Sequence, residues 1–344
     1  MGDFTVIKFP YVFHAVIFWF DLCLDRGKNG IRYRTLKRFN QLIASLAVCV
    51  SMSAVASVEN VGTYNLILKN DLNTSSDIEG RIMIGGNIDM AGKSLDVASR
   101  IAADPVVDAV TVVGDITAND VKTQNGNIVY GGNIGSTNLI LNGSGSVSQQ
   151  SQTTLQNQFD AIYQSVIDDS NYYKTLAANG TFNTSDMNNL KFESTSSDDL
   201  LVFNINGTDL LNGSFSFGFT PTVPIIINVA GTGALNLNSK AFGNFTKQVA
   251  SLVLWNFFDY TSIGFNGDGW NGSVLAPNAD ITSGTGSLDG GFAALSYTGT
   301  VELHNQLFTY EPPGETPGVD VPAPPVFFLL FGGLIATMAL RRRS

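Results

Sequence analysis

Three pairs of carboxylates lie close enough in the sequence for acid/base chemistry: Asp77 with Glu79, Asp198 with Asp199, and Asp259 with Asp268. Two carboxyl groups flanking a glycosidic bond are the usual machinery of glycan hydrolysis. Neighbouring residues of a strand point to opposite faces, so residues two apart, such as Asp77 and Glu79, share a face. The sequence therefore keeps a glycan-active hydrolase or lyase as an alternative function.

Oxygen-rich turns offer a second kind of site, for Ca²⁺. Residues 70–73 and 266–269 carry side-chain oxygens of the kind that Ca²⁺ prefers, but neither turn matches a full EF-hand loop. We therefore predict no required cofactor and treat Ca²⁺ as optional. Its candidate ligands are Asp71, Asp77, Glu79 and Asp268.

Histidine chemistry would depend on His304, because the other histidine lies in the N-terminal segment that we expect to be removed. A serine hydrolase would need a Gly-x-Ser-x-Gly elbow, and the chain has no such sequence. We interpret His304 as a structural residue and predict that the protein is not an enzyme.

Charge and cysteine content narrow the function further. Only 14% of the 344 residues are charged, against about 25% in an average domain. Residues 57–320 carry nine basic and 26 acidic side chains, a net charge of −17. Such a surface repels nucleic acid, so we expect no nucleic-acid partner. Both cysteines, Cys23 and Cys49, precede residue 57, so we expect no disulfide in the mature protein.

The N-terminal region is predicted to be an export signal. Lys37 and Arg38 precede an apolar run over residues 42–55, and Ala54 and Ala56 form a small-x-small cleavage site before Ser57. Residues 36–56 are therefore predicted to be a signal peptide. Residues 1–35 are interpreted as an N-terminal extension or as a mis-assigned start.

The C-terminal region is predicted to be a sorting signal. Residues 311–325 form a Pro-rich linker, and residues 326–344 hold an apolar run followed by arginines. Fifteen apolar residues span about 22 Å as a helix, short of the ~30 Å hydrocarbon core, so we favour transient membrane contact over a permanent anchor. The order of parts resembles the PEP-CTERM signal, which implies an exosortase-type transpeptidase as a partner. Its residues here are Val321, Pro322, Ala323, Pro324, Arg341, Arg342 and Arg343, with Ala323 where the motif usually has an acid.

Residues 57–310 are predicted to form one β-rich ectodomain. Short β-branched runs end in glycine- and asparagine-rich turns, as at residues 82–87 and 128–133. This favours a β-helix, with a β-sandwich or jelly roll as the alternative. Residues 149–178 contain no Gly or Pro, and their apolar side chains recur at helical spacing, which predicts one long amphipathic helix packed alongside.

Two groups of motifs in the ectodomain resemble the choice-of-anchor A family of bacterial surface proteins. Residues 64–68 and 77–87 carry the first, and residues 254–257, 272–279 and 302–305 carry the second. The resemblance implies a β-helix-like adhesive domain and supplies no catalytic residues. We interpret the motif residues as architectural; they are Trp255, Asn256, Phe257, Pro277, Asn278 and His304.

Together these features predict an exported, non-enzymatic protein of the surface, envelope or extracellular matrix of a Gram-negative bacterium. We expect an adhesin or a biofilm-associated protein that binds surface polysaccharide or neighbouring cells. An ice-binding β-helix is a further alternative. It would need evenly spaced threonines, and Thr111, Thr117, Thr123 and Thr137 do not keep one spacing.

Overall fold

The computed structural model describes strands between residues 5 and 32 and residues 61–310, except 187, 212–213, 239–242, 245–246 and 268. The predicted signal peptide, its cleavage site, Asp268, the linker, the sorting motif and the terminal arginines lie outside these residues. The chain forms two compact units, Met1–Val55 and Ala56–Ser344. In the first unit, β1 (Thr5–Phe13) pairs antiparallel with β2 (Val16–Gly27), which pairs with β3 (Gly30–Arg32).

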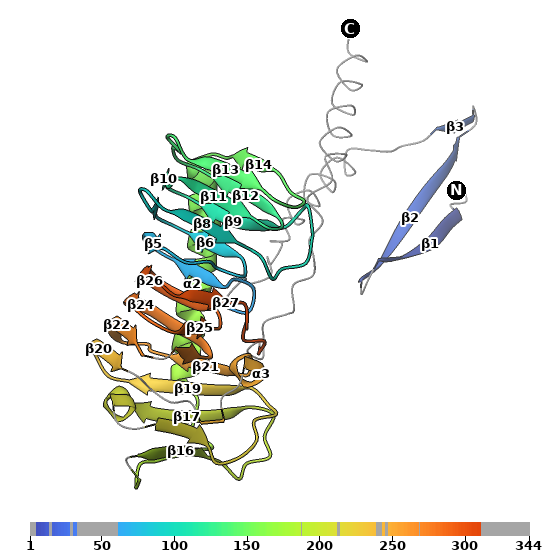
Figure 1. Ribbon diagram of the computed structural model, residues 1–344. Helices are drawn as coiled ribbons and strands as arrows, with labels where there is room; N and C mark the ends of the chain where they lie inside the picture. Colours follow the sequence, from blue (N-terminus) through green and yellow to red (C-terminus); the bar gives the residue numbers. More distant parts are fainter. Residues whose placement is uncertain are drawn as a thin grey trace. The chain divides into compact units, whose positions relative to one another are not determined.

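The second unit is a stack of coils built from short parallel strands (Figure 1). Parallel pairing confirms the predicted β-helix over the sandwich and jelly-roll alternatives, whose sheets are antiparallel. The coils present three faces. One of them, which we call the helix face, holds ten strands: β14 (Val147–Gln149), β12 (Asn127–Tyr130), β9 (Asp108–Val112), β6 (Ile82–Ile84), β4 (Leu66–Leu68), β26 (Phe292–Gly299), β24 (Ser273–Ser283), β21 (Val253–Asn256), β19 (Ile225–Ala230) and β17 (Leu201–Asn206).

Two further faces complete each coil. The open face combines the second halves of β26 and β24 with β10 (Ile116–Thr117), β7 (Ile88–Asp89), β5 (Leu72–Thr74), β22 (Tyr260–Asn266) and β20 (Gly233–Asn238). The seam face holds β13 (Asn138–Leu141), β11 (Asp120–Thr123), β8 (Ser94–Val97), β27 (Glu302–His304), β25 (Ser287–Asp289) and β23 (Trp270–Asn271). One end of the stack is formed by β15 (Thr181–Asn183), β16 (Asn189–Glu193) and β18 (Ser214–Phe217). Two short helices belong to the second half of the stack: η1 (Gly207–Leu211) follows β17, and α3 (Lys247–Ala250) precedes β21.

The chain enters and leaves the stack at its middle. Strand β4 begins the first half, which runs through β6, β9 and β12 to β14. The second half runs from β17 back to β26, which pairs in parallel with β4. Figure 1 shows the result, with the blue first coil lying against the red last coil. The two halves therefore join into one continuous sheet.

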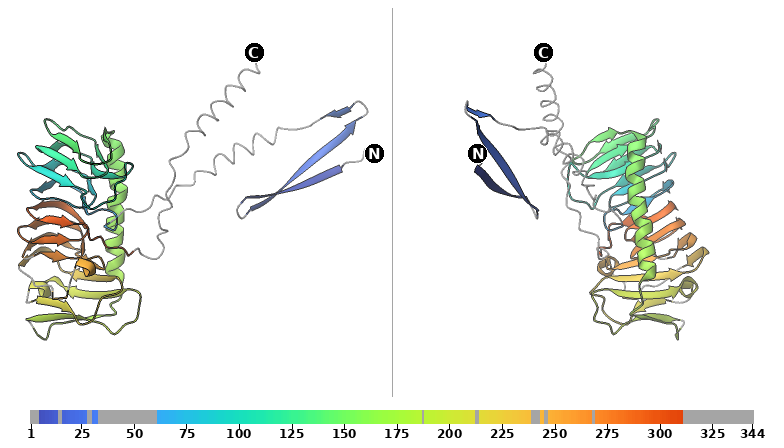
Figure 2. Two further views of the ribbon diagram at one scale, coloured as in Figure 1. Left: turned by 45° about the vertical axis from the view of Figure 1, so that its right-hand side comes forward. Right: turned by 180° about the vertical axis from the view of Figure 1, so that it is seen from behind.

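Helix α2 (Gln152–Thr175) carries the chain from one end of the stack to the other (Figure 2). Its 24 residues span about 36 Å, close to the ~43 Å of nine strand-to-strand steps. This confirms the predicted long helix. Its buried stripe packs on outward-facing side chains of the helix face; the helix contributes Leu155, Phe159, Tyr163, Val166 and Tyr173, and the strands contribute Ile67, Met83, Val129, Ile226, Leu254, Leu275 and Ala293.

The inside of the coils is a second apolar core. Strand residues that alternate with the helix-facing ones point inward, as Leu66 and Leu68 do on either side of Ile67. The second half is rich in aromatic contacts, with Trp255 and Trp270 ring centroids 4.8 Å apart. None of the helices in the described part of the chain is long and apolar enough to span a membrane.

Candidate functional site

The open face presents a row of polar side chains at equivalent positions on parallel strands. Ile116 pairs with Ile88, Leu72 with Ile88 and with Tyr297, and Ile281 with Tyr297. These residues point into the core, so the residue that follows each points outward. The outward row reads Thr117, Asp89, Asn73, Thr298, Thr282, Gly264 and Asn236, and its members other than Asn73 and Gly264 are exposed.

The spacing of this row follows from the strand geometry. Neighbouring strands are about 4.8 Å apart, so seven strands extend the row over about 29 Å. The helix face cannot offer a comparable surface, because α2 covers it. The open face is therefore a long polar surface that α2 leaves uncovered.

An Asn/Asp ladder borders the open face where each coil turns the corner. Asp71 Oδ1 accepts the Asn87 N–H at 2.7 Å, Asn87 Oδ1 accepts the Asp115 N–H at 2.8 Å, and Asp115 Oδ1 accepts the Asn133 N–H at 2.7 Å. Glycines make room for this close approach. A Cβ at Gly86 would lie 2.5 Å from the Asn70 carbonyl carbon. In this structure Asp71, a predicted Ca²⁺ ligand, accepts hydrogen bonds from the backbone N–H and the side-chain amide of Asn87.

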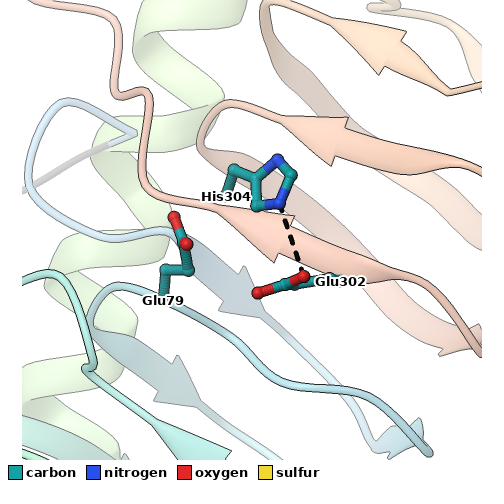
Figure 3. A group of neighbouring side chains, drawn as sticks. All are labelled: Glu79, Glu302 and His304. Carbon is teal, nitrogen blue, oxygen red and sulfur yellow. Dashed lines mark ion pairs between the residues drawn. The ribbon is translucent and has the colours of Figure 1, made fainter. Parts of the chain in front are cut away.

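A group of ionisable side chains lies on the seam face where the first and last coils meet. Ile78 bridges to Leu303, which brings Glu79 beside His304 (Figure 3). Asp289 stands opposite His304 in the pairing of β25 with β27. Glu302 and His304 are two residues apart on β27 and so share a face. We call Glu79, Asp289, Glu302 and His304 the seam cluster.

The seam cluster is partly shielded from water and tightly hydrogen-bonded. His304 Nδ1 contacts Asp289 Oδ1, and His304 Nε2 lies 3.4 Å from Glu302 Oε2. Glu79 accepts the Asn305 N–H at 3.0 Å and the Arg100 Nε–H at 3.3 Å. The Glu79, Asp289 and His304 side chains are 12%, 7% and 13% exposed, whereas Glu302 is 45% exposed.

The other carboxylates proposed for acid/base work have different surroundings. Burial, followed by Asp96 and Glu302, raises the pKa of Asp77 above its usual value. Hydrogen bonds from Ser196 and Asn179 lower the pKa of Asp198. Asp259 forms a 2.9 Å ion pair with Lys174 of α2. Asp198 and Asp259 therefore make contacts with neighbouring side chains, whereas Asp77 lies near Glu302 of the seam cluster.

The predicted architectural residues lie in different parts of the domain: Trp255 and Phe257 belong to the core inside the coils, Asn256 and Pro277 contact α2, and His304 belongs to the seam cluster. Trp255 and Phe257 are fully buried, and Trp255 Nε1 donates to the Asn271 carbonyl at 2.9 Å. Pro277 accepts a 2.7 Å hydrogen bond from Tyr163 of α2, whose pKa is raised by burial. Exposed Asn278 donates to the Phe258 carbonyl at 2.9 Å.

Sequence reasoning missed Asp289 as a partner of His304. The two residues meet only because they occupy paired positions on successive coils, 15 residues apart. Glu302 could be associated with His304 from their spacing of two. Glu79 could not, because more than 200 residues separate it from either.

Comparison with known proteins identifies the stack. A family model described as "Putative Ice-binding-like adhesive domain" matches residues 57–305. The chain belongs to this family of adhesive domains. Among curated proteins none matches the chain. Of the solved structures, a glycosylated ice-binding protein from an Arctic yeast is 12% identical, with a TM-score of 0.32, over 76% of this chain and 97% of that one.

The adhesive-domain match spans both halves of the stack. It begins before β4 and ends just after β27, so it includes every strand of the open face and the whole seam cluster. Membership of this family indicates an adhesive role, which requires an exposed contact surface.

Proposed function

We propose that this protein is a non-enzymatic surface adhesin that binds a repetitive polysaccharide through its open face. The observation that carries the proposal is the row of exposed Thr and Asn side chains on in-register strands of an adhesive-domain family member. The same surface would serve a biofilm or matrix polysaccharide and the coat of a neighbouring cell.

The chemistry of the row suits a sugar polymer. Hydroxyl and amide groups both donate and accept hydrogen bonds, as sugar hydroxyls do. Each contact is weak, because it replaces a hydrogen bond to water. Repetition every ~4.8 Å over about 29 Å lets many such contacts act together on one chain.

Export and anchoring belong to the same proposal. The signal peptide over residues 36–56 would direct the ectodomain across the inner membrane of a Gram-negative bacterium. The PEP-CTERM-like tail would then be processed by an exosortase-type transpeptidase, with brief contact between the apolar run and the membrane. The motifs shared with the choice-of-anchor A family support this arrangement, since that family joins one domain to different surface anchors.

The alternatives from the sequence gain less support. An ice-binding surface needs a regular Thr array, and Asn73, Asp89 and Gly264 interrupt the threonines of the open face. A glycan-cleaving enzyme needs two carboxyl groups placed on either side of a bound sugar, whereas the matched family model describes an adhesive domain. The description of the family names ice binding as well as adhesion, so thermal hysteresis is measured in the test below.

The test is polysaccharide binding by the full chain in mild detergent, on a panel of bacterial exopolysaccharides. The double variant Thr282→Lys/Thr298→Lys places two long charged side chains on the open face. We expect it to bind at least about tenfold more weakly, a loss of about 1.4 kcal/mol. The matched control Gln158→Lys/Gln164→Lys, on exposed positions of α2, adds the same charge and should bind as the wild type does.

Three outcomes would contradict the proposal. Equal binding by both double variants would show that the contact surface lies elsewhere than on the open face. Release of new reducing ends from the polysaccharide would indicate an enzyme. Thermal hysteresis without polysaccharide binding would indicate an ice-binding protein.

A further inference from the structure

We propose that the seam cluster is a binding site for a divalent transition-metal ion of the Zn²⁺ class, held by Glu79, Glu302 and His304. This inference does not depend on the adhesive function. It rests on the geometry of three donor groups that the fold brings together from opposite ends of the ectodomain.

The donor atoms have the spacing of a metal site. One ligand atom from each of Glu79, Glu302 and His304 can be chosen so that all three lie within 4.8 Å of one another. His304 Nε2 and Glu302 Oε2 are 3.4 Å apart. Two donors about 2.1 Å from a tetrahedral Zn²⁺ are also about 3.4 Å apart. This pair therefore already has the separation of two ligands of one Zn²⁺ ion.

Asp289 prepares His304 for this role. The Asp289 carboxylate contacts Nδ1 of the imidazole and, when ionised, can only accept, so it holds the ring proton on Nδ1. Nε2 is then the nitrogen that ligates a metal when the ring is neutral, and it lies 3.4 Å from Glu302 Oε2. A carboxylate behind a ligating histidine is the common support of zinc sites, where it fixes the ring and makes the ligand more basic. Asp289 is thus a positioning residue.

Glu79 can join the site without losing its present contacts. A carboxylate has about four lone pairs, and the Asn305 N–H and Arg100 Nε–H occupy two of those on Glu79. The Arg100 side chain is 71% exposed, so its ion pair with Glu79 contributes little and is easily rearranged. Glu79 is itself only 12% exposed, which favours a cation over water as its neighbour.

The donor set selects the class of metal. Ca²⁺ takes six to eight oxygen ligands, and this group contains an imidazole nitrogen and few oxygens. One histidine with two carboxylates suits Zn²⁺ and its first-row neighbours. Three protein ligands leave a fourth position for water or for a group of a bound molecule. Glu302, which is 45% exposed, lies on the solvent side of the cluster.

A metal ion bound here would link the first coil of the chain to the last. Glu79 belongs to the first coil, whereas Glu302 and His304 belong to the last strand, so one ion would join both ends of the ectodomain chain. A clip between residues far apart in sequence restricts the unfolded chain most. The binding free energy would then add to the stability of the fold.

The experiment is calorimetric Zn²⁺ titration of the full chain in mild detergent, with Cys23 and Cys49 alkylated beforehand. We expect one saturable site. Glu302→Gln and His304→Ala should each weaken Zn²⁺ binding at least about tenfold, and Asp289→Asn about 10–100-fold. The control Glu193→Gln makes the same chemical change in β16, far from the cluster in the stack, and should leave Zn²⁺ affinity unchanged.

A second readout covers variants that fold poorly. At a hundredfold excess of Zn²⁺ over its dissociation constant, Tm of the wild type should rise by about 5–10 °C, and that of Glu302→Gln should not. Because Glu302 is half exposed, its substitution is compatible with folding. A wild type that binds no Zn²⁺, or binding that survives both Glu302→Gln and His304→Ala, would overturn the proposal.

Discussion

Asn256 joins helix α2 to the stack through a network of buried hydrogen bonds. Its Oδ1 accepts the Ser170 hydroxyl at 2.6 Å, and its Nδ2 donates to the Ser170 carbonyl at 2.8 Å and to Asn228 Oδ1 at 2.9 Å. Asn228 in turn donates to the Tyr173 carbonyl at 2.7 Å. Because none of these groups meets water, each depends on its partners.

Replacing Asn256 with Ala should therefore lower the free energy of unfolding by about 2–4 kcal/mol, since it leaves Ser170 and Asn228 with unmet polar atoms. The matched control is Asn278→Ala. Asn278 makes one hydrogen bond at an exposed position, and its loss should cost less than about 1 kcal/mol. Urea denaturation followed by circular dichroism measures both. Equal losses would mean that the buried network adds nothing.

Single residues were predictable from sequence where their role is local. Glycine and asparagine after β-branched runs predicted the corners at Asn87 and Asn133, because turn chemistry depends on neighbouring residues. The ladder of hydrogen bonds between corners was not predictable, because its spacing of 16 to 28 residues is irregular. The seam cluster was even less predictable from the sequence, because it joins Glu79 to residues at the other end of the ectodomain.

At the scale of elements, periodicity predicted the long helix well. Residues 149–178 were expected to be helical, and α2 extends from Gln152 to Thr175. The apolar pattern predicted that Ile162 and Ile167 belong to the buried stripe. In the structure both are only partly buried, whereas Tyr163 and Tyr173 lie in the interface. Their hydroxyl groups make tyrosines look polar in a sequence, but here the rings pack and the Tyr163 hydroxyl finds a backbone partner.

The helix should be held mainly by this stripe. Phe159 is 2% exposed and stacks on Tyr163 with ring centroids 5.4 Å apart. Phe159→Ala should destabilise the protein by about 3–5 kcal/mol, because it removes a large buried side chain and leaves a cavity. The control Gln164→Ala, on the exposed side of the same helix, should change stability by less than about 0.5 kcal/mol. Thermal unfolding of the two variants compares them, and a loss under about 1 kcal/mol for Phe159→Ala would contradict a packed helix.

At the scale of the molecule, the order of the coils was beyond the reach of the sequence. Local patterns predicted strands and a β-helix, and the natural expectation from them is a stack in chain order. The pairing of β4 with β26 instead places Leu66 beside Phe292, at the middle of the sheet. Such contacts join residues more than 200 positions apart, which local sequence patterns do not reveal. They also give the fold many distant contacts, which favours slow folding.

This arrangement should make the whole stack unfold as one unit. An ordinary solenoid contacts only neighbouring coils and can fray from an end. Here α2 lies along the coils of both halves, and the pairing of β4 with β26 links the first coil to the last. A defect in the first half should therefore be felt in the second half, where Trp255 and Trp270 lie.

Gly132→Ala should destabilise the first half of the stack. It is made in a Trp19→Phe background, in which Trp255 and Trp270 are the remaining tryptophans of the sequence. A Cβ at Gly132 would collide with the Gly114 backbone, at a cost of about 1–3 kcal/mol. We expect tryptophan fluorescence and far-ultraviolet circular dichroism to give the same lowered urea midpoint. At the control site, Gly284→Ala, a Cβ would meet only Asn266 Oδ1, at 3.9 Å, and the midpoint should not fall. A lowered circular dichroism midpoint with unchanged fluorescence would mean that the halves unfold independently, because the tryptophans report only on the second half.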